Sequence, residues 1–150
     1  MAVAVREIGM SASVLQLYRK VSAWPLGHWL FSRLVSFKAP YFASIRPVMT
    51  LLEPNREEAT IAHRRSVTNH LGTVHAIALC NLAEFVGGLM TDASIPSTMR
   101  WIPSGMTVQY LKKAVGRQHA LATPAFVRIS RPKPTNCRST WWSPTRRAMR

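Results

Sequence analysis

Three side chains near the middle of the chain have types and spacing that suit chemistry at a carbonyl group. His75 and Glu84 are nine residues apart, and Asn69 lies six residues before His75. Backbone N–H groups in the first turn of a helix can polarise a carbonyl oxygen, and the N–H of Ala76 would be one of them. A carboxylate such as Glu84 can activate water or attack the carbonyl carbon. The pattern therefore favours hydrolysis of a carbonyl compound.

A long helix is expected to position these residues. Val74 to Met90 runs without proline, and its apolar residues cover nearly the whole circumference, which is typical of a helix surrounded by protein. Nine helical residues correspond to about 900° of rotation and about 13 Å of rise, so His75 and Glu84 of one chain point apart. They can meet one substrate only if the helix start of one copy faces Glu84 of another, which predicts a homodimer.

The elements around this helix follow from the hydrophobic pattern. Two short amphipathic helices are expected within residues 10–38, interrupted at Pro25; their basic and Ser-rich composition also resembles a mitochondrial presequence. Alternating apolar residues from Ile45 to Glu53, a turn, and an extended stretch from Glu58 to Thr68 predict a β-hairpin. Alternation from Trp101 to Ala114 predicts a third strand.

The segment Asn69-His70-Leu71-Gly72-Thr73-Val74-His75-Ala76, followed by Leu82-Ala83-Glu84, resembles the hotdog-fold thioesterase superfamily. Members of that superfamily have a turn of the form Asn-x-x-Gly-x-x-His-Gly-Gly and a carboxylate nine residues after the histidine. Here Ala76 and Ile77 replace the two glycines, and the methyl group of Ala76 is expected to narrow the approach to the site.

Further stretches resemble one uncharacterised branch of that superfamily, the DUF4442 or hotdog-like proteins, over residues of about 10–114. They are Pro40-Tyr41-Phe42, Arg64 to His70, Arg100-Trp101-Ile102-Pro103 and Tyr110-Leu111-Lys112-Lys113. The resemblance implies an α+β hotdog fold, in which an antiparallel sheet wraps round a long central helix. It also implies oligomers with sites at the dimer interface.

The resemblance further implies a thioesterase-like protein that hydrolyses acyl-CoA or another acyl thioester. Glu84, His75 and Asn69 would then be catalytic, and Gly72 and Ala76 would bind the substrate carbonyl. No cofactor is expected beyond coenzyme A as part of the substrate, and no metal is expected. The alternative is a non-catalytic protein that binds acyl thioesters, or a truncated hotdog scaffold.

Each of these residues also has a structural interpretation. Glu84 could be a buried carboxylate paired with Asn81, Arg64 or a neighbouring strand. His75 could cap the helix start, and Asn69 could be an ordinary turn residue. Three histidines within thirteen residues, His63, His70 and His75, offer only a weak zinc pattern because no cysteine or close acid accompanies them.

The net charge of +14 is concentrated at the end of the chain, because residues 93–150 hold eleven Lys and Arg and no acid. The expected organisation is an amphipathic helical segment over residues 1–38, a hotdog-like core over 39–114 and a basic, Pro- and Arg-rich disordered tail over 115–150. Nucleic-acid binding by this tail is a second hypothesis. A third hypothesis is that the sequence from about Val115, which contains no Asp or Glu, is a frameshift product. The hotdog fold would then be incomplete.

Other classes of protein find little support in the composition. No window of 18 uncharged apolar residues is present, so a transmembrane segment is not expected. Neither a phosphate-binding loop nor a dinucleotide-binding fingerprint occurs. The two cysteines, Cys80 and Cys137, have neither disulfide-framework nor metal spacing, which favours a reducing, cytoplasmic location.

Overall fold

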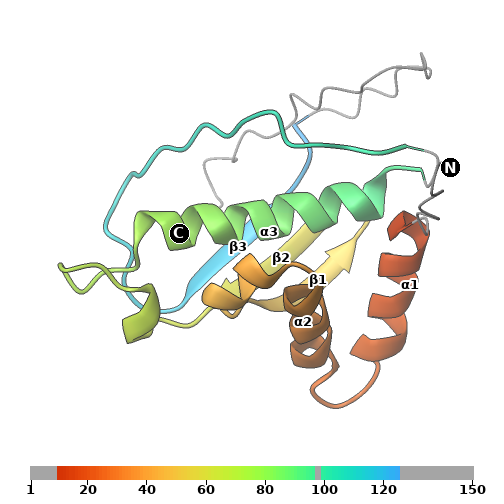
Figure 1. The fold of residues 1–150 in the computed structure, drawn as a ribbon, viewed down its shortest axis with the longest axis horizontal. Helices are drawn as coiled ribbons and strands as arrows, with labels where there is room; N and C mark the ends of the chain where they lie inside the picture. Colours follow the sequence, from red (N-terminus) through yellow and green to blue (C-terminus); the bar gives the residue numbers. More distant parts are fainter. Residues whose placement is uncertain (1–9, 97–98, 126–150) are drawn as a thin grey trace, which may run out of the picture.

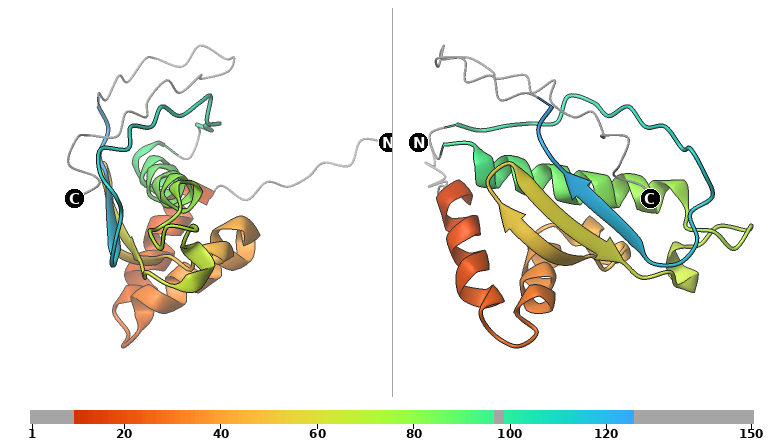
Figure 2. Two further views of the ribbon diagram at one scale, coloured as in Figure 1. Left: turned by 90° about the vertical axis from the view of Figure 1, so that its left-hand side faces the viewer. Right: turned by 180° about the vertical axis from the view of Figure 1, so that it is seen from behind.

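Three antiparallel strands packed against one long helix form the centre of the structure, a computed structural model that describes residues 10–96 and 99–125. The strands β1 (Val48–Glu53), β2 (Arg56–Ile61) and β3 (Gln118–Ala122) lie in the order β1-β2-β3. Helix α3 (Ala76–Ser94) lies along one face of the sheet, with α1 (Met10–Ser22) and α2 (Gly27–Lys38) beside it (Figure 1; Figure 2). Two 3-10 turns, η1 (Pro40–Ser44) and η2 (Arg65–Val67), complete the described elements.

The predicted hairpin is confirmed as β1 and β2, joined by a turn at Pro54 and Asn55. Asn55 adopts a φ of 64°, a left-handed conformation that asparagine tolerates better than most residues. Its N–H donates a hydrogen bond of 2.7 Å to Ser94 Oγ and so ties the turn to the last residue of α3. The second strand ends at Ile61, earlier than the predicted Thr68, because the chain then turns into η2.

The predicted central helix is confirmed, although it begins at Ala76 and continues to Ser94. Its inner side supplies more of the core than any other element, and there Phe85 is fully buried and meets Phe42 edge to face with ring centroids 5.2 Å apart. Burial of one such side chain contributes about 1.5–3 kcal/mol. Within the described residues, α3 alone is long and apolar enough to cross a membrane, and more than half of it is buried inside the protein.

The two predicted N-terminal helices are confirmed as α1 and α2, and they cover the free edge of β1. The N–H of Met49 in β1 donates a hydrogen bond of 2.8 Å to Ser32 Oγ in α2. Tyr18 of α1 packs edge to face on Phe31 of α2, with ring centroids 5.2 Å apart. Edge strands left open can pair with other chains, so this cover protects the sheet.

The predicted third strand over Trp101 to Ala114 is wrong, because this stretch forms no regular strand. It runs along α3 instead, as Figure 1 shows. Side chains at its two ends hold it there. Trp101 Nε1 donates to Asp92 Oδ1 at 2.6 Å, and the Tyr110 hydroxyl lies 2.9 Å from Cys80 Sγ.

The expectation that residues 115–150 contain no regular element is also wrong, because β3 lies within them. β3 pairs with β2 in antiparallel register from Glu57–Ala122 to Ile61–Gln118. Its inward residues, Ala120 and Ala122, are buried but small, so their hydrophobic signal is weak. The core therefore extends beyond the expected limit at 114. Residues 126–150 lie outside the described residues. They contain most of the basic tail, so the hypothesis that this tail binds nucleic acid stays a prediction.

Candidate functional site

The turn that leads into α3 is held by the side chain of Asn69. Its Oδ1 accepts hydrogen bonds from the N–H groups of Leu71 (3.0 Å) and Thr73 (3.1 Å), and its Nδ2 donates to Thr73 Oγ1 at 2.9 Å. Gly72 adopts a φ of 72° in this turn, a conformation that strains residues with a side chain. Asn69 and Gly72 thus position the start of α3, as the turn interpretation of Asn69 requires.

His75 is the N-cap of α3. Its Nδ1 accepts a hydrogen bond of 3.1 Å from the N–H of Ile77, and its carbonyl oxygen accepts from the N–H groups of Ala78 and Leu79. Its own N–H donates to the Val67 carbonyl at 2.8 Å. Because Nδ1 is an acceptor, the neutral imidazole carries its proton on Nε2, a donor that has no hydrogen-bond partner among the described residues.

The backbone N–H of Ala76 has no acceptor among the residues that the structure describes. Ala76 is the first residue of α3, where the helix supplies no internal partner and the helix dipole is positive. Ala76 N–H and His75 Nε2–H come from neighbouring residues at the helix start, and donors of this kind can stabilise negative charge on an oxygen atom.

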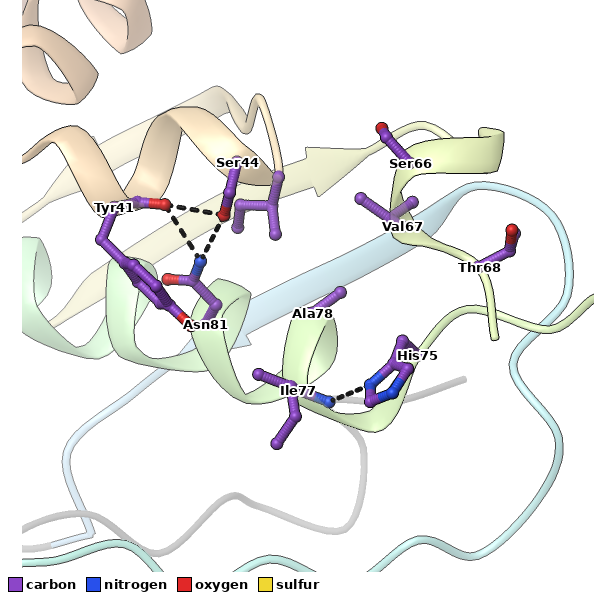
Figure 3. A pocket seen from close by; sticks show the side chains of 10 residues that line it. Tyr41, Ser44, Ser66, Val67, Thr68, His75, Ile77, Ala78 and Asn81 are labelled. Atoms are coloured by element: carbon purple, nitrogen blue, oxygen red, sulfur yellow. Dashed lines mark hydrogen bonds between the residues drawn. The ribbon is translucent and has the colours of Figure 1, made fainter. Parts of the chain in front are cut away.

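A shallow pocket of about 190 Å³ lies beside this helix start, between η1, η2 and the first two turns of α3 (Figure 3). His75 and Ile77 border it at the start of α3, and Val67 and Thr68 border it on the segment before the turn. Tyr41, Ser44, Ile45, Ser66, Ala78 and Asn81 complete its lining.

Asn81 is a pocket residue that the sequence analysis did not place at the site. It is buried on α3, and its Nδ2 donates to Ser44 Oγ (3.2 Å) and to the Tyr41 carbonyl (3.4 Å), as Figure 3 shows. Its Oδ1 is buried without a hydrogen-bond partner among the described residues. Asn81 therefore fixes η1 against α3 and keeps one free acceptor. A polar residue in an otherwise apolar helix was the available signal.

Glu84 is exposed on the outer side of α3, so the interpretation of a buried, paired carboxylate is wrong. The residues named as its partners bind elsewhere: Asn81 contacts η1, and Arg64 donates to Ser44 O and Ser66 Oγ. Within one chain Glu84 and His75 are separated by about 13 Å along the helix axis, and the structure does not bring them together.

Ile77 and Cys80 lie seven and four residues before Glu84, which places them on the same side of α3. Cys80 contacts Tyr110 in the segment that follows Trp101. The hydrogen bond with Cys80 raises the pKa of Tyr110 to about 12, and partial burial adds to this. The Tyr110 hydroxyl thus stays protonated at neutral pH and can donate a hydrogen bond. Glu84 lies between the two anchors of this segment, facing solvent.

The three histidines of the zinc pattern do not form a cluster. His63 Nδ1 accepts a hydrogen bond from the N–H of Gly116, His70 lies in the exposed turn, and His75 caps α3. In residues 10–96 and 99–125, no group of three His, Cys, Asp or Glu side chains is placed to hold a metal ion.

Solved structures place this architecture in the hotdog class. The fold is similar to a thioesterase family protein from Silicibacter pomeroyi (19% identity, TM-score 0.57, 63% of this chain and 70% of that chain). A protein of unknown function from Pseudomonas aeruginosa, described as a probable thioesterase, is similar at 25% identity and a TM-score of 0.57, covering 67% of this chain and 66% of that one. None of the curated proteins compared with the chain matches it.

The chain belongs to the DUF4442 family, a domain of unknown function, whose match covers residues 27–137. A structural-genomics crystal structure shares 51% identity with a TM-score of 0.65, over 75% of this chain and 74% of that one. The family assignment expected from the sequence is thus confirmed, but the match continues well past 114. A departure from the family beginning at Val115 is therefore wrong.

Proposed function

We propose that this protein binds acyl thioesters at the start of α3 and hydrolyses them. The observation that carries the proposal is the N–H of Ala76, which has no acceptor among the described residues and belongs to the first residue of α3, at the positive end of the helix, directly after the N-cap His75. Donors of this kind stabilise the oxyanion that forms when a thioester carbonyl is attacked. The likeness to thioesterase-family structures supports this class of substrate.

In the proposed reaction, Glu84 takes a proton from water as the oxygen adds to the carbonyl carbon. The carbon–sulfur bond then breaks, the thiolate leaves and collects the proton, and a carboxylic acid remains. Direct attack by Glu84 would pass through an anhydride that water then opens. Water is the only co-reactant needed, so the proposal includes neither metal nor cofactor.

The proposal requires two copies of the chain, because His75 and Glu84 of one copy lie too far apart. In a homodimer with two-fold symmetry, the start of α3 in one protomer would face Glu84 of its partner. The exposure of Glu84, Ile77 and Leu111 on this side of α3 supports such an interface. A coenzyme A thioester or an acyl-carrier thioester would then bind between the protomers.

Ala76→Pro tests the oxyanion role of one N–H group. Proline fits the first position of a helix, and His75, with φ of −65° and ψ of 139°, already has the conformation that precedes proline. The variant therefore keeps the fold and loses the donor, and we expect kcat for thiol release from acyl-CoA to fall by about 10²-fold. The matched control, Ala76→Gly, retains the N–H and should retain turnover. Equal turnover in both variants contradicts the oxyanion role.

Glu84→Gln tests the proposed base. Because Glu84 is exposed and forms no ion pair among the described residues, the substitution should leave the melting temperature within about 1 °C. Thiol release should fall by about 10²-fold or more, while acyl-CoA binding remains. Unchanged thiol release would remove Glu84 from the mechanism.

A non-catalytic acyl-thioester-binding protein is the second candidate. The observation that favours it is the use of His75 Nδ1 and Asn69 in hydrogen bonds within the helix start, while Glu84 of the same chain lies about 13 Å from His75 along the helix axis. Isothermal titration with acyl-CoA decides between the two: tight binding by the wild-type chain without any thiol release selects the binding protein.

A further inference from the structure

An apolar surface on the outside of the helical pair is open to solvent. It is formed by six side chains from the α1–α2 connection, from α2 and from η1: Trp24, Leu26, Leu30, Leu34, Phe37 and Tyr41. We call it the α2 outer surface. Trp24 is 72% exposed, Leu26 79% and Phe37 86%, whereas the core side chains of the same helices are nearly inaccessible.

The three residues of the α2 outer surface that belong to α2 share one side of the helix. Leu30, Leu34 and Phe37 are four and then three residues apart, the spacing of a single helical face. The opposite side of α2, with Phe31 and Ser32, is buried against α1 and β1. A helix that is apolar on both sides is normally covered on both, and contiguous exposed apolar side chains mark an interaction surface.

The part of the chain that carries this surface has charges of one sign. Residues 8–52 contain five Lys and Arg and no Asp or Glu. Arg33 lies over the ring of Trp29, 5.7 Å from its centroid. Desolvation lowers the pKa of Arg64, and the positive charges of Arg46 and Arg33 lower it further, so basic groups from three segments lie near one another.

We propose that the α2 outer surface docks the protein onto an anionic lipid surface. Exposed Trp and Tyr side chains prefer the boundary between water and acyl chains, and Leu and Phe would enter the acyl region. The basic side chains beside them would meet the phosphate groups of the lipids. α2 would then lie in the plane of the membrane, with β1 and the core above it.

The same charges argue against two other covers for this surface. A second copy docked through the same surface would bring two sets of basic residues together, which is unfavourable. The chain's own residues 126–150 carry seven Lys and Arg and no acid, so they too are repelled by this surface. An anionic lipid surface would bury the apolar side chains among acyl chains and place lipid phosphate groups beside the positive charges.

Tyr41 links the docking surface to the pocket. It belongs to the α2 outer surface and also lines the pocket beside His75, where its carbonyl accepts from Asn81 (Figure 3). Docking would therefore place the pocket next to the lipid surface, where amphiphilic acyl compounds are concentrated. The docking itself does not depend on catalysis, so it can hold or fail independently of the proposed hydrolysis.

Vesicle flotation of the full chain tests the proposal, using vesicles of phosphatidylcholine alone and of phosphatidylcholine mixed with phosphatidylglycerol. We expect binding to the anionic vesicles, weaker binding at high salt and little binding to the neutral ones. Phe37→Asp should reduce binding to the anionic vesicles by about tenfold or more. Because this side chain is exposed, its replacement should not lower the melting temperature.

Val115→Asp is the matched control, since Val115 is 66% exposed but lies shortly before β3, outside the α2 outer surface and outside the proposed dimer interface. It should bind the anionic vesicles as the wild type does. Equal binding by Phe37→Asp and wild type would show that basic residues elsewhere hold the vesicles, and would overturn the proposal. A loss of molecular mass for Phe37→Asp in light scattering without lipid would identify a second copy as the cover and would overturn it as well.

Discussion

Asn69 shows at the scale of one residue how the site is built. Its side chain makes three hydrogen bonds within the turn before α3. Asn69→Ala should lower the free energy of unfolding by about 2 kcal/mol, because a typical hydrogen bond contributes about 1 kcal/mol and their losses are not fully additive. Urea unfolding measures this loss.

Asn69→Asp is the control for this prediction, since it keeps the acceptor for Leu71 and Thr73 and loses only the donor to Thr73. It should lose less stability than Asn69→Ala. If both variants unfold like the wild type but turn over acyl thioesters slowly, Asn69 acts on the substrate instead of on the turn.

The sequence predicts where α3 begins, but it does not predict which side of α3 is exposed. His75 and Ala76 could be placed at the first turn because polar residues and a glycine precede an unbroken apolar run. The exposed side of α3 could not be predicted, since apolar residues surround the helix and hide which side is uncovered. Glu84 and Asn81 were therefore hard to tell apart: the structure exposes the first and buries the second.

At the scale of elements, the junction of α1 and α2 depends on the absence of a side chain at Gly27. A Cβ atom there would lie 1.9 Å from the Val21 carbonyl oxygen. Gly27→Ala should therefore force the helices apart and lower the free energy of unfolding by about 2 kcal/mol or more. Thermal unfolding gives the measurement.

Gly105→Ala is the matched control, because no atom lies within 4 Å of a Cβ at that position. Its free energy of unfolding should stay within about 0.5 kcal/mol of the wild type. Similar losses for both glycine variants would mean that α1 and α2 do not meet as closely at Gly27 as the structure shows.

Strand prediction succeeded for the hairpin and failed for the rest of the sheet. The hairpin has its partner strand next to it in the sequence, with a clear turn between the two. Apolar and polar residues alternate equally well from Trp101 to Ala114, but this alternation does not show whether the edge of a neighbouring strand is available for pairing. β3 was missed because Ala120 and Ala122 pack against β2 and α3 with little hydrophobic surface.

At the scale of the whole molecule, Glu57 makes folding depend on pH. Its carboxyl group is fully buried, and neither oxygen has a hydrogen-bond partner among the described residues. Burial raises the pKa of Glu57 well above its ordinary value of 4.5, and the negative charge of Asp92 adds to it. The folded chain therefore holds a proton that the unfolded chain releases.

The free energy of unfolding should consequently fall as pH rises from about 4.5 toward the folded-state pKa of Glu57. Asp92, whose pKa is also raised by burial, contributes with the same sign. Glu57→Gln removes the first contribution, so its melting temperature should exceed that of the wild type by more at about pH 8 than at about pH 5. A difference that stays constant with pH would show that Glu57 is ionised in the folded protein.

A composite site between two copies is the central claim of this account, and mixing two inactive variants tests it most directly. Ala76→Pro keeps Glu84, and Glu84→Gln keeps the helix start, so one of the two sites in each mixed dimer contains both groups. After subunit exchange, thiol release from acyl-CoA should return to about a quarter of the wild-type rate, because half of the dimers are mixed and each has one intact site. If the wild-type protein releases thiol but the mixed and exchanged sample recovers no activity, the composite site is contradicted.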